Sequence, residues 1–347
     1  MTTSTTRPGE LMAAEIEEQP AVFDRILLES SGHITKVAAR IREASPRFVL
    51  IAARGTSDHA ALYLKYLVEV VLGLPAGLAS PSTMTTYGAR PLLRDVLWVA
   101  VSQSGGSPDL VESTRVARDG GALTLAVTNA PGSALEDAAE LRLDIRAGRE
   151  RAVAATKTYT ATLLTLWLLV DAWRGGDGSA ARSLPPLAEA VLADDSVLAL
   201  APRYRFAERM VVTGRGFSYP TAREAALKLM ETSYVGAQAF SGADLLHGPL
   251  AMVDQGQPVL AIVSPGAGGE AMDPVLTRVT ERGGDVAVIG VASSSPSHRC
   301  VLVPGDDHEL APLLQIIPFQ RLAHAMAVAR HNDPDAPRGL AKVTQTF

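Results

Sequence analysis

Hydroxyl side chains gather where a short apolar run gives way to a helical stretch, an arrangement that suits phosphate binding. The clearest cluster follows the apolar run 97–101 and comprises Ser102, Gln103, Ser104 and Ser107. Because the first N–H groups of a helix have no partner within it, the backbone around Gly105 and Gly106 could wrap an anion together with these hydroxyls. Serine is also a favoured helix cap, so this segment alone leaves a structural interpretation open.

Further hydroxyls occupy equivalent positions along the chain. Thr56 and Ser57 follow an earlier apolar run, and residues 155–158 (ATKT) open a third helical stretch. Capping needs fewer hydroxyls than these segments supply, which favours an anion site. Later in the chain, Ser264-Pro265-Gly266 follows a comparable run with fewer hydroxyls, which predicts a vestigial site there.

A different set of groups stands in the second half of the chain. Glu224, Lys228 and Glu231 recur at helical spacing, and His247 lies in a loop bounded by glycine and proline (ADLLHGPLAM). Carboxylate, amine and imidazole are the groups that acid/base catalysis uses. The same residues could instead form a solvated helix face held by ion pairs and a loop histidine with a structural role.

The composition narrows the classes of function. The chain has 347 residues, 47% of them hydrophobic and 20% charged, as expected of a globular protein with room for two domains. Its formal net charge of −5 and pI near 5.8 disfavour binding to nucleic acid or to an anionic membrane. Cys300 is the single cysteine and none of the seven histidines has metal-ligand spacing, so we expect no disulfide, no metal and no cofactor. The polar start, Met1 to Glu10, and this cysteine usage predict a cytoplasmic protein.

The elements that must position these residues form an internal repeat. A strand, turn and helix are expected over 47–71 and again over 209–231. A strand, turn, helix and second strand are expected over 97–128 and again over 259–291, at a nearly constant offset. Apolar strands that alternate with helices in this way predict two parallel sheets, each covered by helices on both faces.

The composition also suggests where the parts of the chain begin and end. Residues 174–186 (RGGDGSAARSLPP) are rich in glycine, serine and proline, which is typical of a connection. We expect a helical arm at 1–28 with a break at Pro20, a first domain at 29–173, a linker at 174–200, a second domain at 201–331 and a tail at 332–347.

Six separated motifs carry a specific resemblance to a known family: ARGTSDHA, VSQSGGSPD, VAATKTYT, GRGFSYPTAREAALKLMETSY, ADLLHGP and PRGLAK. In this order, and with the arm MAAEIEEQP before them, the sequence resembles the isomerase half of glucosamine-6-phosphate synthase. The resemblance implies an α/β fold of two tandem sugar isomerase (SIS) domains, each a flavodoxin-like three-layer sandwich with a parallel sheet flanked by helices. The glutaminase domain of the synthase and its nucleophilic cysteine have no counterpart, so we expect a glutamine-independent activity.

The resemblance also implies roles for individual residues. It assigns the phosphate of a sugar to Ser102, Gln103, Ser104 and Ser107. Thr56 and Ser57 would lie beside the sugar, Val153 would contact it through its backbone, and Ala155 would form part of the pocket wall.

The catalytic roles follow from the same resemblance. Glu231 would move a proton between C1 and C2, Lys228 would polarise the sugar oxygens, and Lys342 would attack the C2 ketone as a Schiff base. His247 would open the sugar ring from the neighbouring subunit, which makes a homodimer the minimum assembly and leaves a tetramer open.

Four positions depart from the synthase pattern. Arg54 replaces a cysteine and adds a cation, and Asp244 replaces a glutamate ahead of the histidine. Gly106 replaces a glutamate and Ala155 replaces a serine that bonds the sugar, so the substituent preferred at C2 or C3 is expected to differ.

These observations favour a glucosamine-6-phosphate deaminase, a deaminating isomerase that forms fructose 6-phosphate and ammonia. The same residues would also serve a fructosamine-phosphate deglycase. If the nitrogen is acetylated, Glu231 could still remove the C2 proton and expel the 3-hydroxyl, giving a dehydratase of N-acetylglucosamine 6-phosphate. A phosphosugar sensor is the non-enzymatic alternative, although no basic helix-turn-helix segment is visible.

Overall fold

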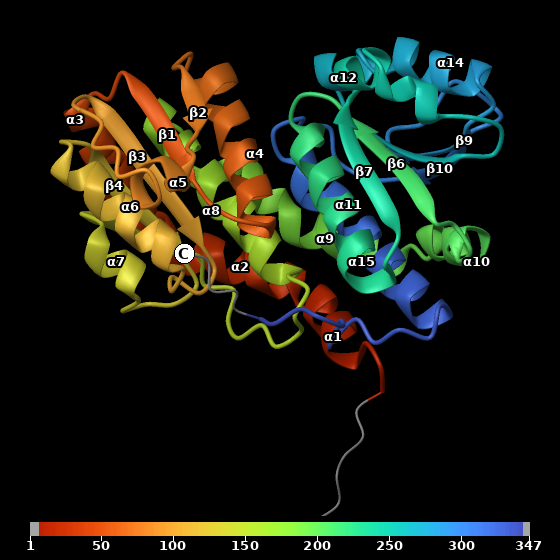
Figure 1. The fold of residues 1–347 in the computed structure, drawn as a ribbon, viewed down its shortest axis with the longest axis horizontal. Helices are drawn as coiled ribbons and strands as arrows, with labels where there is room; N and C mark the ends of the chain where they lie inside the picture. The colour runs from red at the N-terminus through yellow and green to blue at the C-terminus, as the bar shows by residue number, and fades with distance from the viewer. Residues whose placement is uncertain (1–6, 343–347) are drawn as a thin grey trace, which may run out of the picture. The chain divides into compact units, whose positions relative to one another are not determined.

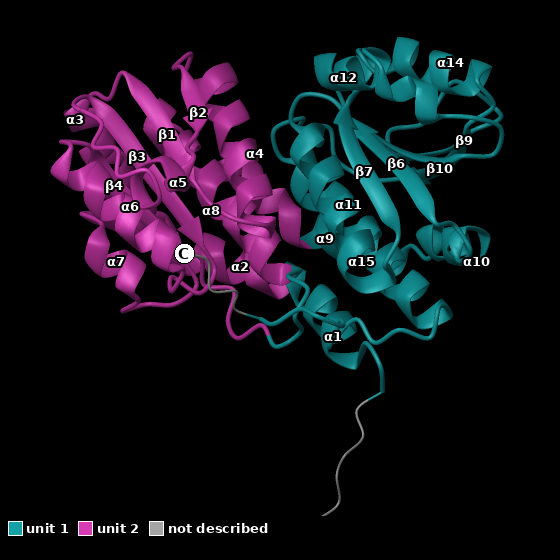
Figure 2. Cartoon of the chain, viewed as in Figure 1, with its two compact units in different colours: residues 1–20, 151–156, 186–342 teal, residues 21–150, 157–185, 343–347 magenta. Residues whose placement is uncertain are grey.

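The computed structural model describes residues 7–342, which form two compact units (Figure 2). Within the described residues, unit 1 comprises 7–20, 151–156 and 186–342, and unit 2 comprises 21–150 and 157–185. Unit 1 therefore contains part of the N-terminal arm, a short internal loop and the tail as far as Lys342, in addition to the second repeat. The first six residues of the expected arm and the last five of the expected tail lie outside the described residues.

Unit 2 is built around a five-stranded parallel sheet of order β2-β1-β3-β4-β5 (Figure 1). Its strands are β1 (Phe48–Ala52), β2 (Ala76–Leu78), β3 (Val96–Ser102), β4 (Leu123–Thr128) and β5 (Leu141–Asp144). In the centre, Leu97 of β3 stands opposite Val49 of β1 and Leu123 of β4. The central strands are almost wholly buried, because helices cover a parallel sheet on both faces.

Unit 1 repeats the same topology with the order β10-β9-β8-β6-β7. Its strands are β6 (Arg209–Gly214), β7 (Gly236–Ser241), β8 (Pro258–Val263), β9 (Asp285–Gly290) and β10 (Arg299–Leu302). Counted within each unit, both sheets have the order 2-1-3-4-5 of the flavodoxin-like fold. The central strands of both sheets occur where the apolar runs predicted them. The edge strands were not predicted, because β2, β5 and β10 have only three or four residues each and β7 (GAQAFS) is not an apolar, β-branched run.

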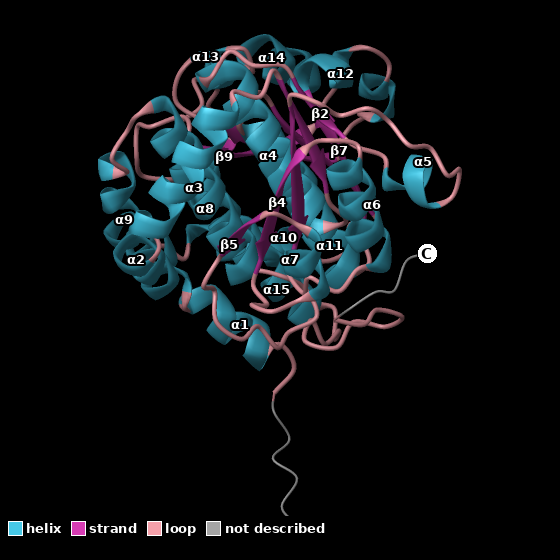
Figure 3. Cartoon of the chain, turned by 90° about the vertical axis from the view of Figure 1, so that its left-hand side faces the viewer, coloured by secondary structure: helices cyan, strands magenta, loops and turns pink. Residues whose placement is uncertain are grey.

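Helices form the outer layers of each unit (Figure 3). In unit 2, α3 (Ser31–Ala44) and α4 (Thr56–Val71) both contact α8 (Lys157–Arg174), and α5 (Pro81–Thr85) and α7 (Ala134–Ala138) both contact α6 (Pro108–Asp119). In unit 1, α10 (Leu200–Tyr204), α11 (Ser218–Ser233) and α15 (Ala311–Ala329) form one group, and α12 (Gly242–Leu246) contacts α14 (Asp273–Glu281) in the other. The predicted three-layer α/β fold with two parallel sheets is confirmed.

Buried apolar side chains fill the space between sheet and helices in each unit. Trp98 and Ala100 of β3 pack with Leu110 of α6 in unit 2, and Val259 of β8 packs with Val275 of α14 in unit 1. Burial of such side chains is the main favourable contribution to the stability of each unit.

The connecting segments contain more regular structure than their composition suggested. The expected linker at 174–200 holds the 3₁₀ helices η1 (Ser179–Ser183) and η2 (Ser196–Ala199) and the helix α9 (Leu184–Ala193). The helical arm is interrupted at Glu18, between α1 (Glu10–Glu17) and α2 (Gln19–Glu29), and Pro20 stands in the first turn of α2, where its missing N–H costs nothing. The remaining short helices are η3 (Pro249–Met252) and α13 (Ala267–Glu270). No helix within residues 7–342 combines the length and apolar character needed to cross a bilayer.

Candidate active site

The serine-rich loop of unit 2 lies at the topological switch point of its sheet. In the order 2-1-3-4-5, ligands bind beyond the carboxyl ends of the first and third strands. Here β1 ends at Ala52, just before Thr56 and Ser57, and β3 ends at Ser102, the first residue of the hydroxyl cluster. The topology therefore brings the predicted phosphate-binding segments of this unit to one edge of one sheet.

Hydrogen bonds and close packing shape this loop. The Gly105 N–H donates to the Ser102 hydroxyl at 3.2 Å, and the Asn129 N–H donates to the Gln103 carbonyl at 3.1 Å. Gly105 has φ +61°, and a Cβ atom at this position would lie 2.1 Å from the Ser133 hydroxyl, so only glycine fits. The loop is thus held in one compact turn at the end of β3.

Ser107 occupies the N-cap position of α6, but its side chain makes no capping hydrogen bond. Pro108 follows at the first helical position, where no N–H is needed. Ser104 and Ser107 are both partly exposed, whereas Ser102 is buried. The geometry therefore weakens the interpretation of Ser107 as a simple cap and leaves its hydroxyl available beside the positive end of a twelve-residue helix.

Arg54 connects the two segments of this edge. Its guanidinium contacts the carboxylate of Asp109 at 2.8 Å, and Asp109 also accepts a hydrogen bond from the Leu110 N–H at 2.9 Å. The Asp109 side chain is 4% exposed and that of Arg54 is 44% exposed. The sequence analysis did not identify Asp109. The signal available in the sequence was an acidic residue at the start of the helix predicted to bind an anion, together with the arginine that follows β1.

The proton-transfer candidates of unit 1 form one cluster on α11. The ammonium of Lys228 is fully buried and lies 2.5 Å from the Glu231 carboxylate and 3.4 Å from that of Glu224. Glu224 is fully buried, whereas 22% of the Glu231 side chain is exposed. The interpretation as a solvated helix face is therefore wrong for Glu224 and Lys228, because both side chains are fully buried. The carboxylates compensate the charge of the buried ammonium.

Glu231 is the member of this cluster that can meet a substrate. It stands in the last turn of α11, where a carboxylate interacts unfavourably with the negative end of the helix dipole. The adjacent ammonium of Lys228 offsets that interaction. The arrangement places a partly exposed carboxylate next to a buried ammonium.

His247 is placed apart from any such cluster in the described structure. It follows α12, its side chain is exposed, and its Nδ1 lies 2.8 Å from the Ala243 carbonyl. Ser241 caps the same short helix, because its hydroxyl accepts the Asp244 N–H at 3.2 Å and donates to the Asp244 carboxylate at 2.7 Å. The carbonyl contact fixes the orientation of the imidazole and leaves Nε2 directed away from the helix backbone.

The expected Schiff-base lysine is ordered and belongs to unit 1. The Lys342 ammonium donates a hydrogen bond of 2.7 Å to the Ala152 carbonyl, next to Val153 in sequence. The Val153 N–H donates to the Asp335 carbonyl at 3.3 Å, and the side chain of Ala155 is partly buried. The structure thus brings Lys342 to the loop that contains two of the predicted sugar-contacting residues.

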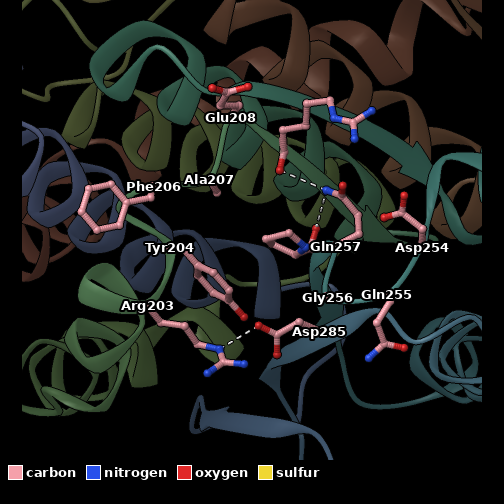
Figure 4. Close-up of a pocket in the computed structure, with 12 residues that line it drawn as sticks. Arg203, Tyr204, Phe206, Ala207, Glu208, Asp254, Gln255, Gly256, Gln257 and Asp285 are labelled. Atoms are coloured by element: carbon pink, nitrogen blue, oxygen red, sulfur yellow. Dashed lines mark hydrogen bonds and ion pairs between the residues drawn. The ribbon is translucent and has the colours of Figure 1, made fainter.

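A separate cavity of about 520 Å³ lies at the amino ends of β6, β8 and β9 (Figure 4). Two of its charged lining residues, Asp285 and Arg203, pair at 2.7 Å, and Asp285 also pairs with Arg299 at 2.6 Å. Burial raises the pKa of Tyr204 to about 12, so this side chain stays neutral and cannot serve as a base near neutral pH. Ligands of this fold bind at the opposite, carboxyl ends of the strands, so we do not assign the chemistry to this cavity.

Two flavodoxin-like sheets with the same strand order, one with a hydroxyl-rich loop at its switch point, define a duplicated α/β protein. The chain belongs to the SIS domain family, whose model matches residues 44–172 and 204–330. The resemblance drawn from the six motifs is thereby confirmed.

Relatives within this family are sugar-phosphate enzymes. The chain is 37% identical over 341 residues to a glutamine–fructose-6-phosphate aminotransferase (isomerizing) of Methanothermobacter thermautotrophicus, with 95% of this chain and 56% of the relative covered. The same enzyme of Thermus thermophilus is 35% identical, with 95% and 58% covered. The chain therefore spans a little over half the length of these relatives and matches their isomerase part.

Solved structures agree. A candidate phosphosugar isomerase of Silicibacter pomeroyi is 35% identical with a TM-score of 0.85, and 93% of this chain and 99% of that chain are covered. The C-terminal domain of glucosamine-fructose-6-phosphate aminotransferase from Francisella tularensis gives a TM-score of 0.86 at 26% identity, with 97% and 100% covered. A glucosamine-6-phosphate deaminase of Thermotoga maritima shares the fold at 20% identity, with a TM-score of 0.75 and with 96% and 99% covered.

Proposed function

We propose that this chain is a phosphosugar enzyme that converts glucosamine 6-phosphate and water into fructose 6-phosphate and ammonia. The observation that carries this proposal is the Lys342 amine at the Ala152 carbonyl, in the same unit as the Glu231–Lys228 pair. A primary amine is required to exchange nitrogen at C2 through a Schiff base, whereas proton transfer alone needs only the carboxylate.

The proposed steps balance without an added cofactor. His247 assists ring opening, after which Glu231 removes the C2 proton of the open-chain aldehyde and returns it to C1. One proton of the amine moves to the C1 oxygen in the same isomerisation, so the product has a C1 hydroxyl and an imine at C2. Lys342 attacks that carbon and expels ammonia, and one water then hydrolyses the lysine Schiff base to the ketone of fructose 6-phosphate.

The phosphate is assigned to the loop at the end of β3. Ser104 and Ser107 are partly exposed, and the Ser107 hydroxyl is not used for capping. Gln103 and the backbone of this loop, with Thr56 and Ser57 after β1, complete the proposed binding set. Hydroxyls and N–H groups at a helix start are the usual means of holding a phosphate without a metal.

The acetylated substrate is the second candidate, and the small side chains of the loop segments favour it. A Cβ atom at Gly106 would meet nothing closer than the Ser104 hydroxyl at 3.8 Å, and Ala155 presents a methyl group in place of a polar side chain. An N-acetyl group makes imine formation impossible. Glu231 would then remove the C2 proton and the 3-hydroxyl would leave as water, which makes the enzyme a dehydratase of N-acetylglucosamine 6-phosphate.

A homodimer in which His247 serves the neighbouring subunit is part of the proposal. His247 is exposed on the described chain and lies in a loop after a short helix, so a second subunit can reach it. Size measurement in solution, followed by mixing of inactive His247→Ala and Glu231→Gln chains, tests this. Activity recovered on mixing supports shared sites, and no recovery in exchanged dimers contradicts them.

The reaction itself is tested by supplying each sugar separately. Glucosamine 6-phosphate, N-acetylglucosamine 6-phosphate and a fructosamine 6-phosphate are incubated with the protein, and ammonia, fructose 6-phosphate and the ultraviolet absorbance of an unsaturated sugar are measured. Ammonia from the first sugar supports the proposal. Absorbance from the second without ammonia supports the dehydratase, and release of an amine from the third supports a deglycase. Thermal stabilisation by these sugars with no turnover favours a sensor.

A further inference from the structure

The N-terminal arm contributes a buried carboxylate to the loop that contains Ala152. Glu15 of α1 is 4% exposed, although charged side chains are seldom buried without a partner. Its carboxylate accepts hydrogen bonds from the backbone N–H groups of Arg151 and Ala152, the latter at 3.1 Å. Two N–H donors on one carboxylate fix the loop to the arm at this point.

The same peptide segment receives the lysine assigned to imine chemistry. Ala152 donates its N–H to Glu15 and accepts the Lys342 ammonium on its carbonyl at 2.7 Å. The position of that carbonyl, and with it the position of the amine, therefore depends on how the N–H groups of the loop are held. Glu15 acts on Lys342 through this one residue.

A second contact between tail and arm closes the arrangement. The carboxylate of Asp335 accepts the N–H groups of Leu11 at 2.9 Å and Met12 at 2.7 Å, in the first turn of α1. The backbone carbonyl of Asp335 accepts the Val153 N–H at 3.3 Å. Hydrogen bonds thus connect the arm, the loop and the tail to one another. The arm therefore helps to position the lysine of the tail.

We propose that Glu15 is a positioning residue for Lys342, and this inference rests on the function proposed above. A carboxylate that only stabilised the arm would not need to hold the two N–H groups next to the acceptor of the lysine. The consequence is specific: Glu15 serves the imine step at C2 and is dispensable for proton transfer by Glu231.

The test compares Glu15→Gln with Glu17→Gln, a matched change at an exposed position of the same helix. Borohydride trapping of fructose 6-phosphate on Lys342, located by peptide mass mapping, reports the imine step. Exchange of the C2 proton of glucosamine 6-phosphate with deuterated water reports the Glu231 step. Misplacement of the amine by about 1 Å predicts a loss on the order of 100-fold in trapping and in kcat for ammonia release, with C2 exchange and KM nearly unchanged.

Each result of this test either supports or overturns the positioning role of Glu15. If borohydride traps as much adduct on Lys342 in Glu15→Gln as in Glu17→Gln, the positioning role is overturned. Ammonia release by the unaltered protein still upholds the proposed function in that case. Equal losses in trapping and in C2 exchange indicate a general structural role and also overturn it. No adduct on Lys342 in the unaltered protein overturns the lysine chemistry and this inference together. If Glu15→Gln does not fold, Glu15→Asp, which keeps the charge on a shorter stem, is expected to show the same selective loss in a milder form.

Discussion

The loops that follow β3 and β8 occupy the same place in the two copies of the fold but differ in chemistry. After β3, the loop carries hydroxyls and leads straight into a helix of twelve residues. After β8, Ser264 leads into α13, which has only four residues, and the adjoining cavity of about 340 Å³ is lined by Glu270 and Asp273 among others. Because carboxylates repel a phosphate and a four-residue helix has only a small dipole, we expect the second copy to bind anions less well than the first.

The helices that follow β1 and β6 also differ in chemistry, and here the buried ionisable groups lie in unit 1. In unit 2, the Lys65–Glu69 ion pair of α4 is partly exposed, whereas α11 in unit 1 carries the buried Lys228 between two carboxylates. Under the proposed function the two copies have different roles: one uses its switch-point loop to bind the phosphate, and the other supplies ionisable groups from a helix. A fold therefore does not by itself assign a function to either copy.

The largest effect expected from this division is the loss of the base. Glu231→Gln keeps size and hydrogen bonding but removes the proton acceptor, so we expect kcat to fall by about 10²- to 10⁴-fold with KM nearly unchanged. Glu281→Gln, at a largely exposed position of α14, serves as the control. Steady-state kinetics with glucosamine 6-phosphate make the measurement. Undiminished turnover would remove unit 1 from the acid/base role.

The second prediction addresses the two equivalent loops directly. Ser104→Ala with Ser107→Ala should weaken binding of the phosphorylated sugar, because each hydrogen bond to a charged group contributes about 1.5 to 3 kcal/mol. Ser264→Ala, at the matching place of unit 1, should leave binding unchanged. The dissociation constants of glucosamine 6-phosphate and of glucosamine, measured by calorimetry, separate the phosphate from the sugar. Equal weakening for both sugars would contradict the phosphate assignment.

The sequence predicted the repeated architecture because apolar, β-branched runs identify central strands of a parallel sheet without any knowledge of their partners. Edge strands such as β2 lack that pattern and are formed by pairing with a neighbour, here Ala76 with Val49. Serines after β3 could be recognised as candidate ligands because they directly follow a strand. The buried state of Lys228 could not, since helical spacing alone does not show which face of α11 is covered.

Contacts between residues far apart in sequence were the least predictable part of the site. Glu15 lies in the arm segment MAAEIEEQP, but neither that segment nor the sequence around Asp335 indicates their partners, which are backbone N–H groups that every residue except proline carries. Arg54 and Asp109 could be paired only after the topology had placed the ends of β1 and β3 side by side. Physical chemistry identifies reactive side chains from sequence, but the partners of backbone groups follow from the fold.

The pair at the switch point gives a prediction about stability. Arg54→Ala leaves the buried Asp109 carboxylate without its cation, and we expect a loss of about 1 to 2 kcal/mol in the free energy of unfolding, less than for a fully buried pair because Arg54 is partly exposed. The double variant Arg54→Ala/Asp109→Ala should lose less than the sum of the single variants. Chemical denaturation of the four proteins measures this coupling. If the losses of the two single variants add up to the loss of the double variant, the Arg54–Asp109 contact contributes nothing to the free energy of unfolding.

The smallest expected effect concerns the arm of unit 1 and its dependence on pH. Burial lowers the pKa of His324 below the ordinary 6.5 and is the largest influence on it. The hydrogen bond to the Gly9 carbonyl and the charge of Asp335 raise this pKa, but by less. The imidazole Nε2 lies 3.0 Å from the Gly9 carbonyl, so the neutral ring must donate its proton there. Because the unfolded chain binds a proton more readily than the folded one, the free energy of unfolding should fall as pH drops from 6.5 toward the lowered pKa, and this contribution should be constant above 6.5.

His298 complicates this measurement, since burial lowers its pKa as well. The variant His324→Gln keeps a donor for the Gly9 carbonyl but cannot titrate, and it should flatten part of the slope between pH 5 and 6.5, whereas His298→Gln should flatten a separate part. Denaturant unfolding at several pH values resolves the two contributions, which add because the residues share no partner. A slope unchanged in His324→Gln would show that the contact between the arm and α15 does not respond to pH.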